Sequence, residues 1–335
     1  MRKLVGIQYL RAVAALGVVI FHAANHYGLS FTVGQAGVDL FFILSGFLMI
    51  AITDARTRPG PFIADRLRRI VPVYWIVTTL MVVGGVLQLF PSMKLTVWHI
   101  LSSYLFIPSI SPSNGQMWPL VVPGWTLNFE IFFYAVFASL FFLKTVRLRV
   151  AALVLVFLCL VAAGLLFQPN APIYRTYTDP MALEFAAGAV LGLMWKEGKL
   201  DRMPAGPVVV AAILLYGVAC TLSDLQYRLF AYGLPALLIV AGTLRFEQTS
   251  TVPSHRLPLF LGDASYSIYL WHGLGISIVT KILRHIDLAA PLKMWICVLI
   301  GTAAGALAFM CVERPLMRVL KERRFVGRAP VPAGP

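Results

Sequence analysis

Two ionisable residues, Arg11 and His22, interrupt a long apolar run near residues 8–26. In an α-helix, the 11 positions between them correspond to about 20° of rotation beyond whole turns and a rise of roughly 16 Å. One helix face therefore presents a cation near one end and a group that can transfer protons near the other. A snorkelling arginine and a histidine bonded to a neighbouring helix would need no chemistry. The shared face favours a functional site.

A pair of arginines lies where a later apolar run begins. In the stretch RPGPFIADRLRRIVPVYW, Arg66 and Arg69 are at i and i+3, so they share one face of a helix. Guanidinium groups bind phosphate in a bidentate manner, and this pair predicts a clamp for a phosphorylated cosubstrate at the mouth of the membrane. Ordinary anchoring of basic residues at the cytoplasmic side is the alternative.

Glu130 is the acidic residue that we expect to support a histidine. It lies five residues inside the run that begins near Trp125, at a depth similar to that of His22. A carboxylate beside an imidazole can orient the ring and stabilise the imidazolium that forms when the ring takes a proton. A structural partnership with an arginine or asparagine is the alternative, and Glu184 raises the same question with less context.

Further polar residues in the apolar runs are candidates for the lining of a cavity. One run has polar residues at i, i+4 and i+7, namely Ser265, Tyr269 and His272. Their side chains form a polar stripe that lines a cavity or simply makes hydrogen bonds to adjacent helices. Gly46, next to Ser45, allows another backbone to approach closely, so packing is an equal explanation there. The complete predicted lining is Asp39, Ser45, Trp125, Tyr134, Ser265, Tyr269 and His272.

These residues require membrane-spanning helices to position them. Of the 335 residues, 59% are hydrophobic and 13% are charged, and the mean hydropathy is +0.81, values typical of an integral membrane protein. Apolar runs of about 20 residues without strand-like alternation predict an all-α bundle. We expect about ten transmembrane helices within a single domain, residues 1–316. Their approximate ranges are 8–26, 36–54, 69–90, 125–143, 150–167, 180–196, 207–222, 228–244, 258–283 and 291–312.

The segment 97–108, VWHILSSYLFIP, is too short to cross, and we predict that it is re-entrant or interfacial. With a cytoplasmic N-terminus, 21 of the 28 Lys and Arg residues then lie on the inner side and six on the outer side, with Arg11 within a span. This bias is the positive-inside pattern, so the net charge of +14 reflects topology and anionic lipid rather than nucleic acid. The tail, residues 317–335, is then a basic cytoplasmic segment whose Pro/Gly-rich end is disordered.

The four cysteines do not suggest a metal site or a disulfide framework. Cys159, Cys220, Cys297 and Cys311 all lie in apolar runs and form no CxxC pair. We expect buried free thiols and no bound metal.

Taken in order, these motifs resemble the acyltransferase 3 family of multi-pass membrane O-acyltransferases. Arg11 to His22 matches the R-x10-H pattern of the family, FFILSG (41–46) matches FFxxSG, and Arg66 with Arg69 matches RxxR. The remaining matches are GWTLNFEIFFY (124–134), SYSIYLWH (265–272) and ERP (313–315). The resemblance covers nearly the whole chain and is strongest to the bacterial branch that acetylates exopolysaccharides.

The resemblance implies an enzyme of the bacterial inner membrane with both termini in the cytoplasm. It would transfer an acyl group, usually acetyl, from cytoplasmic acetyl-CoA as cosubstrate to a sugar hydroxyl of a glycan or lipid-linked sugar, without a bound cofactor. His22 would be the catalytic residue, supported by Glu130, and Arg11, Arg66 and Arg69 would bind the donor. Membrane lipids and exopolysaccharide assembly proteins would be further partners.

Several alternatives remain open at this stage. Intramembrane Arg, His and Glu also mark a transporter or flippase with a proton pathway. Within the enzyme class, the donor could be succinyl-CoA and the acceptor lipopolysaccharide, peptidoglycan or a small lipid-linked sugar. His22 could deprotonate the sugar hydroxyl or first accept the acyl group, because a neutral imidazole can do either. The sequence indicates no oligomeric state.

Overall fold

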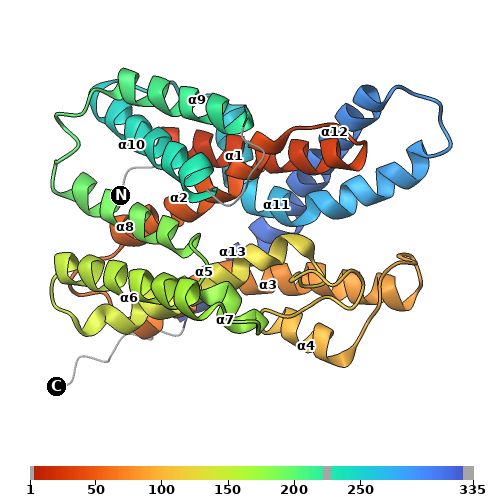
Figure 1. Ribbon diagram of the computed structural model, residues 1–335, viewed down its shortest axis with the longest axis horizontal. Helices are drawn as coiled ribbons and strands as arrows, with labels where there is room; N and C mark the ends of the chain where they lie inside the picture. The colour runs from red at the N-terminus through yellow and green to blue at the C-terminus, as the bar shows by residue number, and fades with distance from the viewer. Residues whose placement is uncertain (1–3, 222–227, 327–335) are drawn as a thin grey trace.

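The computed structural model describes residues 4–221 and 228–326, and within these ranges the chain is all-helical, without a strand (Figure 1). The predicted all-α class is confirmed. Arg2, Lys3 and the Pro/Gly-rich segment 327–335 lie outside the described residues, as does the side chain of Cys220.

The described part of the chain contains thirteen α-helices in succession. Their bounds are α1 Val5–His26, α2 Ala36–Ile52, α3 Pro59–Val86, α4 Val97–Tyr104, α5 Trp125–Ser139, α6 Val146–Phe167, α7 Pro172–Tyr177, α8 Ala182–Lys196, α9 Ala205–Thr221, α10 Leu234–Thr249, α11 Arg256–Leu283, α12 Ala290–Ala308 and α13 Arg314–Val326. The π-helical turns Leu229–Gly233 and Phe309–Glu313 lead into α10 and α13.

In the described part of the chain, seven helices are long and apolar enough to cross a membrane. The expected number of about ten is therefore not confirmed. The 15 residues of α8 and the apolar segment Ala205–Ala219 of α9 are shorter than a typical crossing. α11 has 28 residues but carries polar groups such as Asp263 and His272 along its length.

The segment around residue 100 forms a helix of only eight residues, α4, which rises about 12 Å and cannot cross a bilayer. The chain after it folds back onto it. The Leu120 N–H donates to the Ser103 hydroxyl at 3.0 Å, and His99 Nε2 lies 2.9 Å from the Trp118 carbonyl oxygen. α4 and the following segment thus pack against each other.

Loops between the helices lie at two opposite ends of the bundle (Figure 1). We call the end that carries the α2–α3 loop, 53–58, and the α8–α9 connection the basic end, at the left of Figure 1. Lys196 Nζ donates to the Thr53 carbonyl oxygen there, at 2.5 Å. The α3–α4 and α11–α12 loops project at the other end, which we call the far end.

Small residues bring the central helices into close contact. A Cβ atom added at Gly46 on α2 would lie 2.1 Å from the Phe185 carbonyl oxygen on α8. At Gly188 on α8 it would lie 2.1 Å from the Ile43 carbonyl oxygen of α2. The backbones of α2 and α8 therefore meet where only glycine fits, as in other membrane helix pairs. The predicted close approach at Gly46 is present in the structure.

We expect Gly46→Ala to destabilise the folded protein by roughly 1–3 kcal/mol, because the added methyl group collides with backbone rather than with a movable side chain. Thermal unfolding of the purified protein in detergent would measure the loss. Gly217→Ala on α9 is the matched control, since its methyl group would meet no atom within 4 Å. Equal unfolding temperatures for the two variants would contradict this prediction.

Candidate active site

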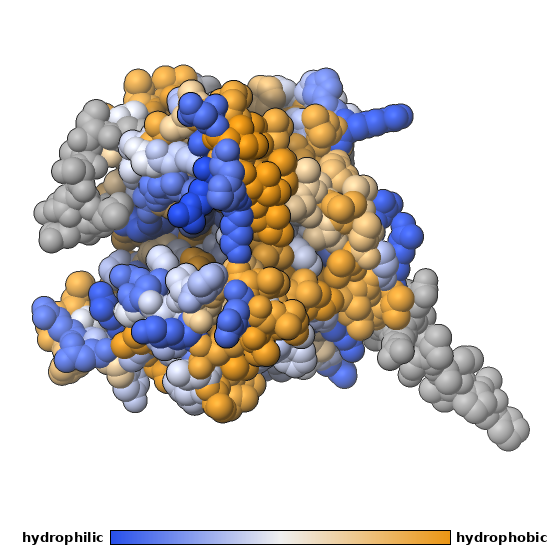
Figure 2. All heavy atoms as spheres, turned by 90° about the vertical axis from the view of Figure 1, so that its right-hand side faces the viewer, coloured by the Kyte–Doolittle hydropathy of each residue, from blue (hydrophilic) through white to orange (hydrophobic). Residues whose placement is uncertain are grey.

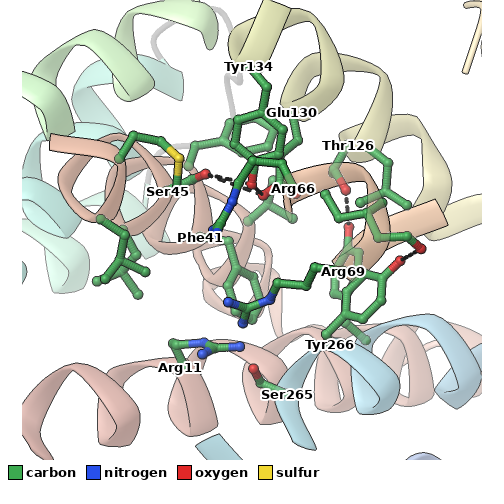
Figure 3. Close-up of a pocket in the computed structure, with 18 residues that line it drawn as sticks. Arg11, Phe41, Ser45, Arg66, Arg69, Thr126, Glu130, Tyr134, Ser265 and Tyr266 are labelled. Atoms are coloured by element: carbon green, nitrogen blue, oxygen red, sulfur yellow. Dashed lines mark hydrogen bonds between the residues drawn. The ribbon is translucent and has the colours of Figure 1, made fainter. Parts of the chain in front are cut away.

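A cavity bounded by α1, α2, α3, α5 and α11 contains most of the polar residues singled out in the sequence (Figure 3). We call it the arginine cavity. Its polar lining consists of Arg11, Ser45, Arg66, Arg69, Thr126, Glu130, Tyr134, Ser265, Tyr266 and Tyr269. The rest of the lining is apolar.

Three arginines converge in this cavity from two helices. Arg11 comes from α1, and Arg66 and Arg69 come from successive turns of α3; Figure 3 shows all three pointing into the same space. None of them forms an ion pair within 4.0 Å with another described residue. The Arg66 Nε atom is buried and makes no hydrogen bond there. The cavity therefore concentrates positive charge that an anionic ligand would neutralise.

The carboxylate of Glu130 is oriented by neighbouring hydroxyl groups. The Tyr134 hydroxyl, one turn further along α5, donates to Glu130 Oε1, and the Ser45 hydroxyl of α2 donates to the same atom at 3.3 Å. Because both donors bind one oxygen, the other oxygen is left to interact with a ligand or with the arginines. The polar face of α5 is thus directed into the arginine cavity.

A hydroxyl pair closes one side of the arginine cavity. The Thr126 hydroxyl donates to the Pro123 carbonyl oxygen at 2.9 Å and lies 3.0 Å from the Tyr269 hydroxyl. A threonine hydroxyl has one hydrogen, so Tyr269 must donate to Thr126. The ring of Phe41 packs edge-on against Tyr269, with centroids 5.7 Å apart. This layer of three side chains forms a wall of the cavity.

A second cavity opens at the far end, and we call it the histidine cavity. Its polar lining comprises His22, His26, His99, Ser92, Ser111, Ser113, Asn114, Trp118, His272 and Ser277. Figure 2, which faces this end, shows hydrophilic surface around a hollow between the upper and lower parts of the molecule. No described group of three or more His, Cys, Asp or Glu is arranged to hold a metal ion.

His22 and His272 face each other in the histidine cavity. Their ring centroids are 5.1 Å apart, with the planes tilted by 33°. His272 is 1% exposed, and its Nδ1 lies 2.8 Å from the Tyr269 carbonyl oxygen and 3.2 Å from that of Ile268. Two acceptors at Nδ1 require the proton there, so the lone pair is on Nε2. The pair therefore contains a ring nitrogen with a free lone pair, in a fixed tautomer.

His22 and Glu130 do not share a cavity, contrary to the expectation from their similar depths. Glu130 lines the arginine cavity, whereas the ring that faces His22 is that of His272. Depth along a helix does not specify rotation about it, and rotation decides which neighbour a side chain meets. Glu130 is therefore placed to act on the arginine side.

Asp39 and Trp125 line neither cavity, which corrects their predicted place. Asp39 is completely buried, and Arg228 Nη2 lies 2.8 Å from its Oδ2. The Trp125 ring packs edge-on against Phe129, because the cavity face of α5 carries Thr126, one residue and about 100° away. Glu184, also buried, lies beside Asp39 and lines neither of the two cavities.

We expect Arg228→Gln to lower the free energy of unfolding by about 3–5 kcal/mol, because Asp39 would remain buried without its cation. Thermal unfolding in detergent would measure this loss. Adding Asp39→Asn to the same variant should recover part of it, since the uncompensated charge is then removed. A single variant as stable as the parent would contradict the role of the pair.

Two polar residues of the arginine cavity were not identified from the sequence. Thr126 lies four residues before Glu130 on the same face of α5, so the i, i+4, i+8 series with Tyr134 is the signal that indicates it. Tyr266 donates its hydroxyl to the Ile70 carbonyl oxygen of α3, 2.7 Å away. That contact joins residues 196 positions apart, and no local pattern indicates it.

A family model described as an acyltransferase domain matches residues 4–311. The chain belongs to this acyltransferase family. The acyltransferase is 46% identical over 317 residues to the exopolysaccharide production protein ExoZ of Rhizobium meliloti, covering 93% of this chain and 99% of that protein.

More distant relatives carry acetyltransferase names. A putative peptidoglycan O-acetyltransferase of Bacillus subtilis is 27% identical over 98% of this chain and 57% of its own length. A putative O-acetyltransferase of Staphylococcus aureus is 24% identical over 95% of this chain and 58% of its own length. The acyltransferase thus spans less than two thirds of these two relatives. No solved structure matches it.

Proposed function

We propose that this acyltransferase moves an acetyl group from acetyl-CoA to a sugar hydroxyl of an exopolysaccharide precursor. The observation that carries the proposal is that the arginines and the histidines line two separate cavities, and that α1, α3 and α11 contribute to both. Three arginines without described ion pairs suit the phosphates of CoA. Two facing histidines suit the transfer of a proton from a hydroxyl group.

The site can perform the transfer with its own residues. The sugar oxygen attacks the thioester carbonyl carbon, the bond from that carbon to sulfur breaks, and the sugar proton passes to the lone pair of His22. The histidine then returns the proton to the thiolate, which leaves as CoA. An acyl-imidazole on His22 is the second route, because the same lone pair can attack the thioester first.

Helix α1 and the two ends of the bundle have separate roles in this proposal. α1 links the two cavities, since Arg11 and His22 lie about 16 Å apart along it. The basic end would lie in the cytoplasm of a bacterium, where CoA is made, and the far end outside the inner membrane. The pantetheine arm would then run along the side chains of Phe41, Thr126 and Tyr269 towards the histidines.

The acceptor follows from the relative at 46% identity, which is named for exopolysaccharide production. Comparing the O-acetyl content of surface glycans by NMR, with and without the gene, tests both donor group and acceptor. We expect the loss of O-acetyl signals from one sugar position and their return when the gene is restored. Unchanged glycan spectra, or the loss of succinyl instead of acetyl signals, would refute the proposal as stated.

A further inference from the structure

The loop 53–58, between α2 and α3, is held by cations on its main-chain carbonyl groups. Arg149, only 1% exposed, donates from Nη1 to the Asp54 carbonyl oxygen at 2.7 Å and from Nη2 to that of Ala55 at 3.4 Å. Lys196 binds the carbonyl oxygen of Thr53 at 2.5 Å. Three successive carbonyl groups are thus bound, and the loop has a defined shape at the basic end.

The acidic group of this loop is used within the loop. Asp54 Oδ1 accepts from the Thr57 hydroxyl at 2.9 Å and from the Arg56 N–H at 2.8 Å, which lowers the pKa of the Asp54 carboxyl. Arg56 and Arg58 are exposed, and neither forms an ion pair with a residue that the structure describes. Their charges therefore remain available to a ligand.

A groove lies between this loop and the start of α3. Its lining includes Arg56, Thr57 and Arg58 from the loop, and Asp65 and Arg66 from α3. Arg66 lines the arginine cavity as well, so it is the residue that the two hollows share.

The charge around the groove favours an anion. It is lined by three arginines, Arg56, Arg58 and Arg66, and two further cations, Arg149 and Lys196, lie behind its loop. The nearby acidic residues already have partners: Asp54 is engaged within the loop, and Asp65 lies 3.6 Å from Arg68. Arginines at a shaped surface bind phosphate groups in a bidentate manner.

A CoA donor has two sets of phosphates, the pyrophosphate next to the pantetheine arm and the 3′-phosphate on the ribose. If the arm enters the arginine cavity, the pyrophosphate passes Arg66 and Arg69, and the ribose lies on the outer side of Arg66. We propose that the groove of Arg56, Arg58 and Arg66 binds the ribose 3′-phosphate of the acyl-CoA donor. This inference rests on the proposed function, and it makes Arg149 and Lys196 positioning residues for the loop.

The test compares CoA with dephospho-CoA, which lacks the 3′-phosphate, as ligands of the full chain in nanodiscs of neutral phosphatidylcholine. Isothermal titration calorimetry should give at least about tenfold tighter binding of CoA, the value of one charge-assisted contact. The double variant Arg56→Gln with Arg58→Gln should lose that preference and keep the parent's affinity for dephospho-CoA.

The matched control removes two cations at the same end that are already paired. Arg147 and Lys199 lie 2.5 Å and 2.7 Å from the Glu197 carboxylate, outside the groove. Arg147→Gln with Lys199→Gln should keep the preference for CoA, which separates local contacts from the general field. Arg149→Gln should reduce the preference as the replacement of Arg56 and Arg58 does, because the loop loses the cation that holds its carbonyl groups.

Three results would overturn the inference. Equal affinities of the parent protein for CoA and dephospho-CoA would exclude a 3′-phosphate site. An unchanged preference in the Arg56 and Arg58 variant, together with weaker binding to phosphatidylglycerol vesicles, would assign these arginines to lipid headgroups. An equal loss for both ligands would place them elsewhere on the donor. If the parent bound neither ligand, the proposed function itself would fail.

Discussion

His22→Ala should lower the rate of acetyl transfer at least about 100-fold, while the affinity for acetyl-CoA stays unchanged. Proton transfer by a positioned side chain contributes a factor on the order of 10²–10⁴ to the rate. If His22 instead carries the acyl group, its removal eliminates the covalent route altogether. The donor affinity should persist because His22 lies in the histidine cavity, whereas the arginines line the other one. Single-turnover transfer of labelled acetyl and calorimetry with CoA would measure the two quantities separately.

The histidine control for this experiment is His285→Ala, an exposed residue in the α11–α12 loop that lines neither cavity. It should transfer acetyl at the parent rate. Full activity of the His22 variant would remove this residue from the mechanism. A parallel loss of donor affinity would show that His22 acts through the structure of the arginine cavity instead.

Arg66→Gln combined with Arg69→Gln should weaken the binding of acetyl-CoA at least about 100-fold. Each charge-assisted hydrogen bond to a phosphate is worth about 1.5–3 kcal/mol, so the loss of two such contacts gives this factor or more. Calorimetry in neutral nanodiscs would measure the dissociation constant, and an increase in KM should accompany it.

Arg68→Gln is the matched control on the same helix. Its side chain is 47% exposed and lies 3.6 Å from Asp65, outside the arginine cavity. The control should bind acetyl-CoA as the parent does. Unchanged affinity in the Arg66 and Arg69 variant would return both residues to the anchoring role of cytoplasmic arginines.

Contacts within one helix were predictable from the sequence. Arg66 and Arg69, at i and i+3, line one cavity, and Glu130 and Tyr134, at i and i+4, form a hydrogen bond. The α-helical repeat specifies such neighbours because it depends only on local backbone geometry. The short segment near residue 100 was also predictable, since length alone prevents it from crossing.

The number of spans was less predictable than their class. Apolar composition indicates helices in membranes, but a helix packed inside a protein can be apolar without being long enough to cross, as α8 is. A helix such as α11 can be long and polar because its polar side chains face cavities and neighbouring helices.

By itself, the sequence determined an all-helical membrane acyltransferase, the pair of Arg66 and Arg69, and the position of His22 on the first helix. Tertiary structure decided which groups lie together: His22 faces His272, Glu130 shares a cavity with the arginines, and Asp39 contacts Arg228. The last two partners are separated by 189 residues in the chain. Their contact depends on how helices rotate and pack against one another, and a helical repeat carries no information about that rotation.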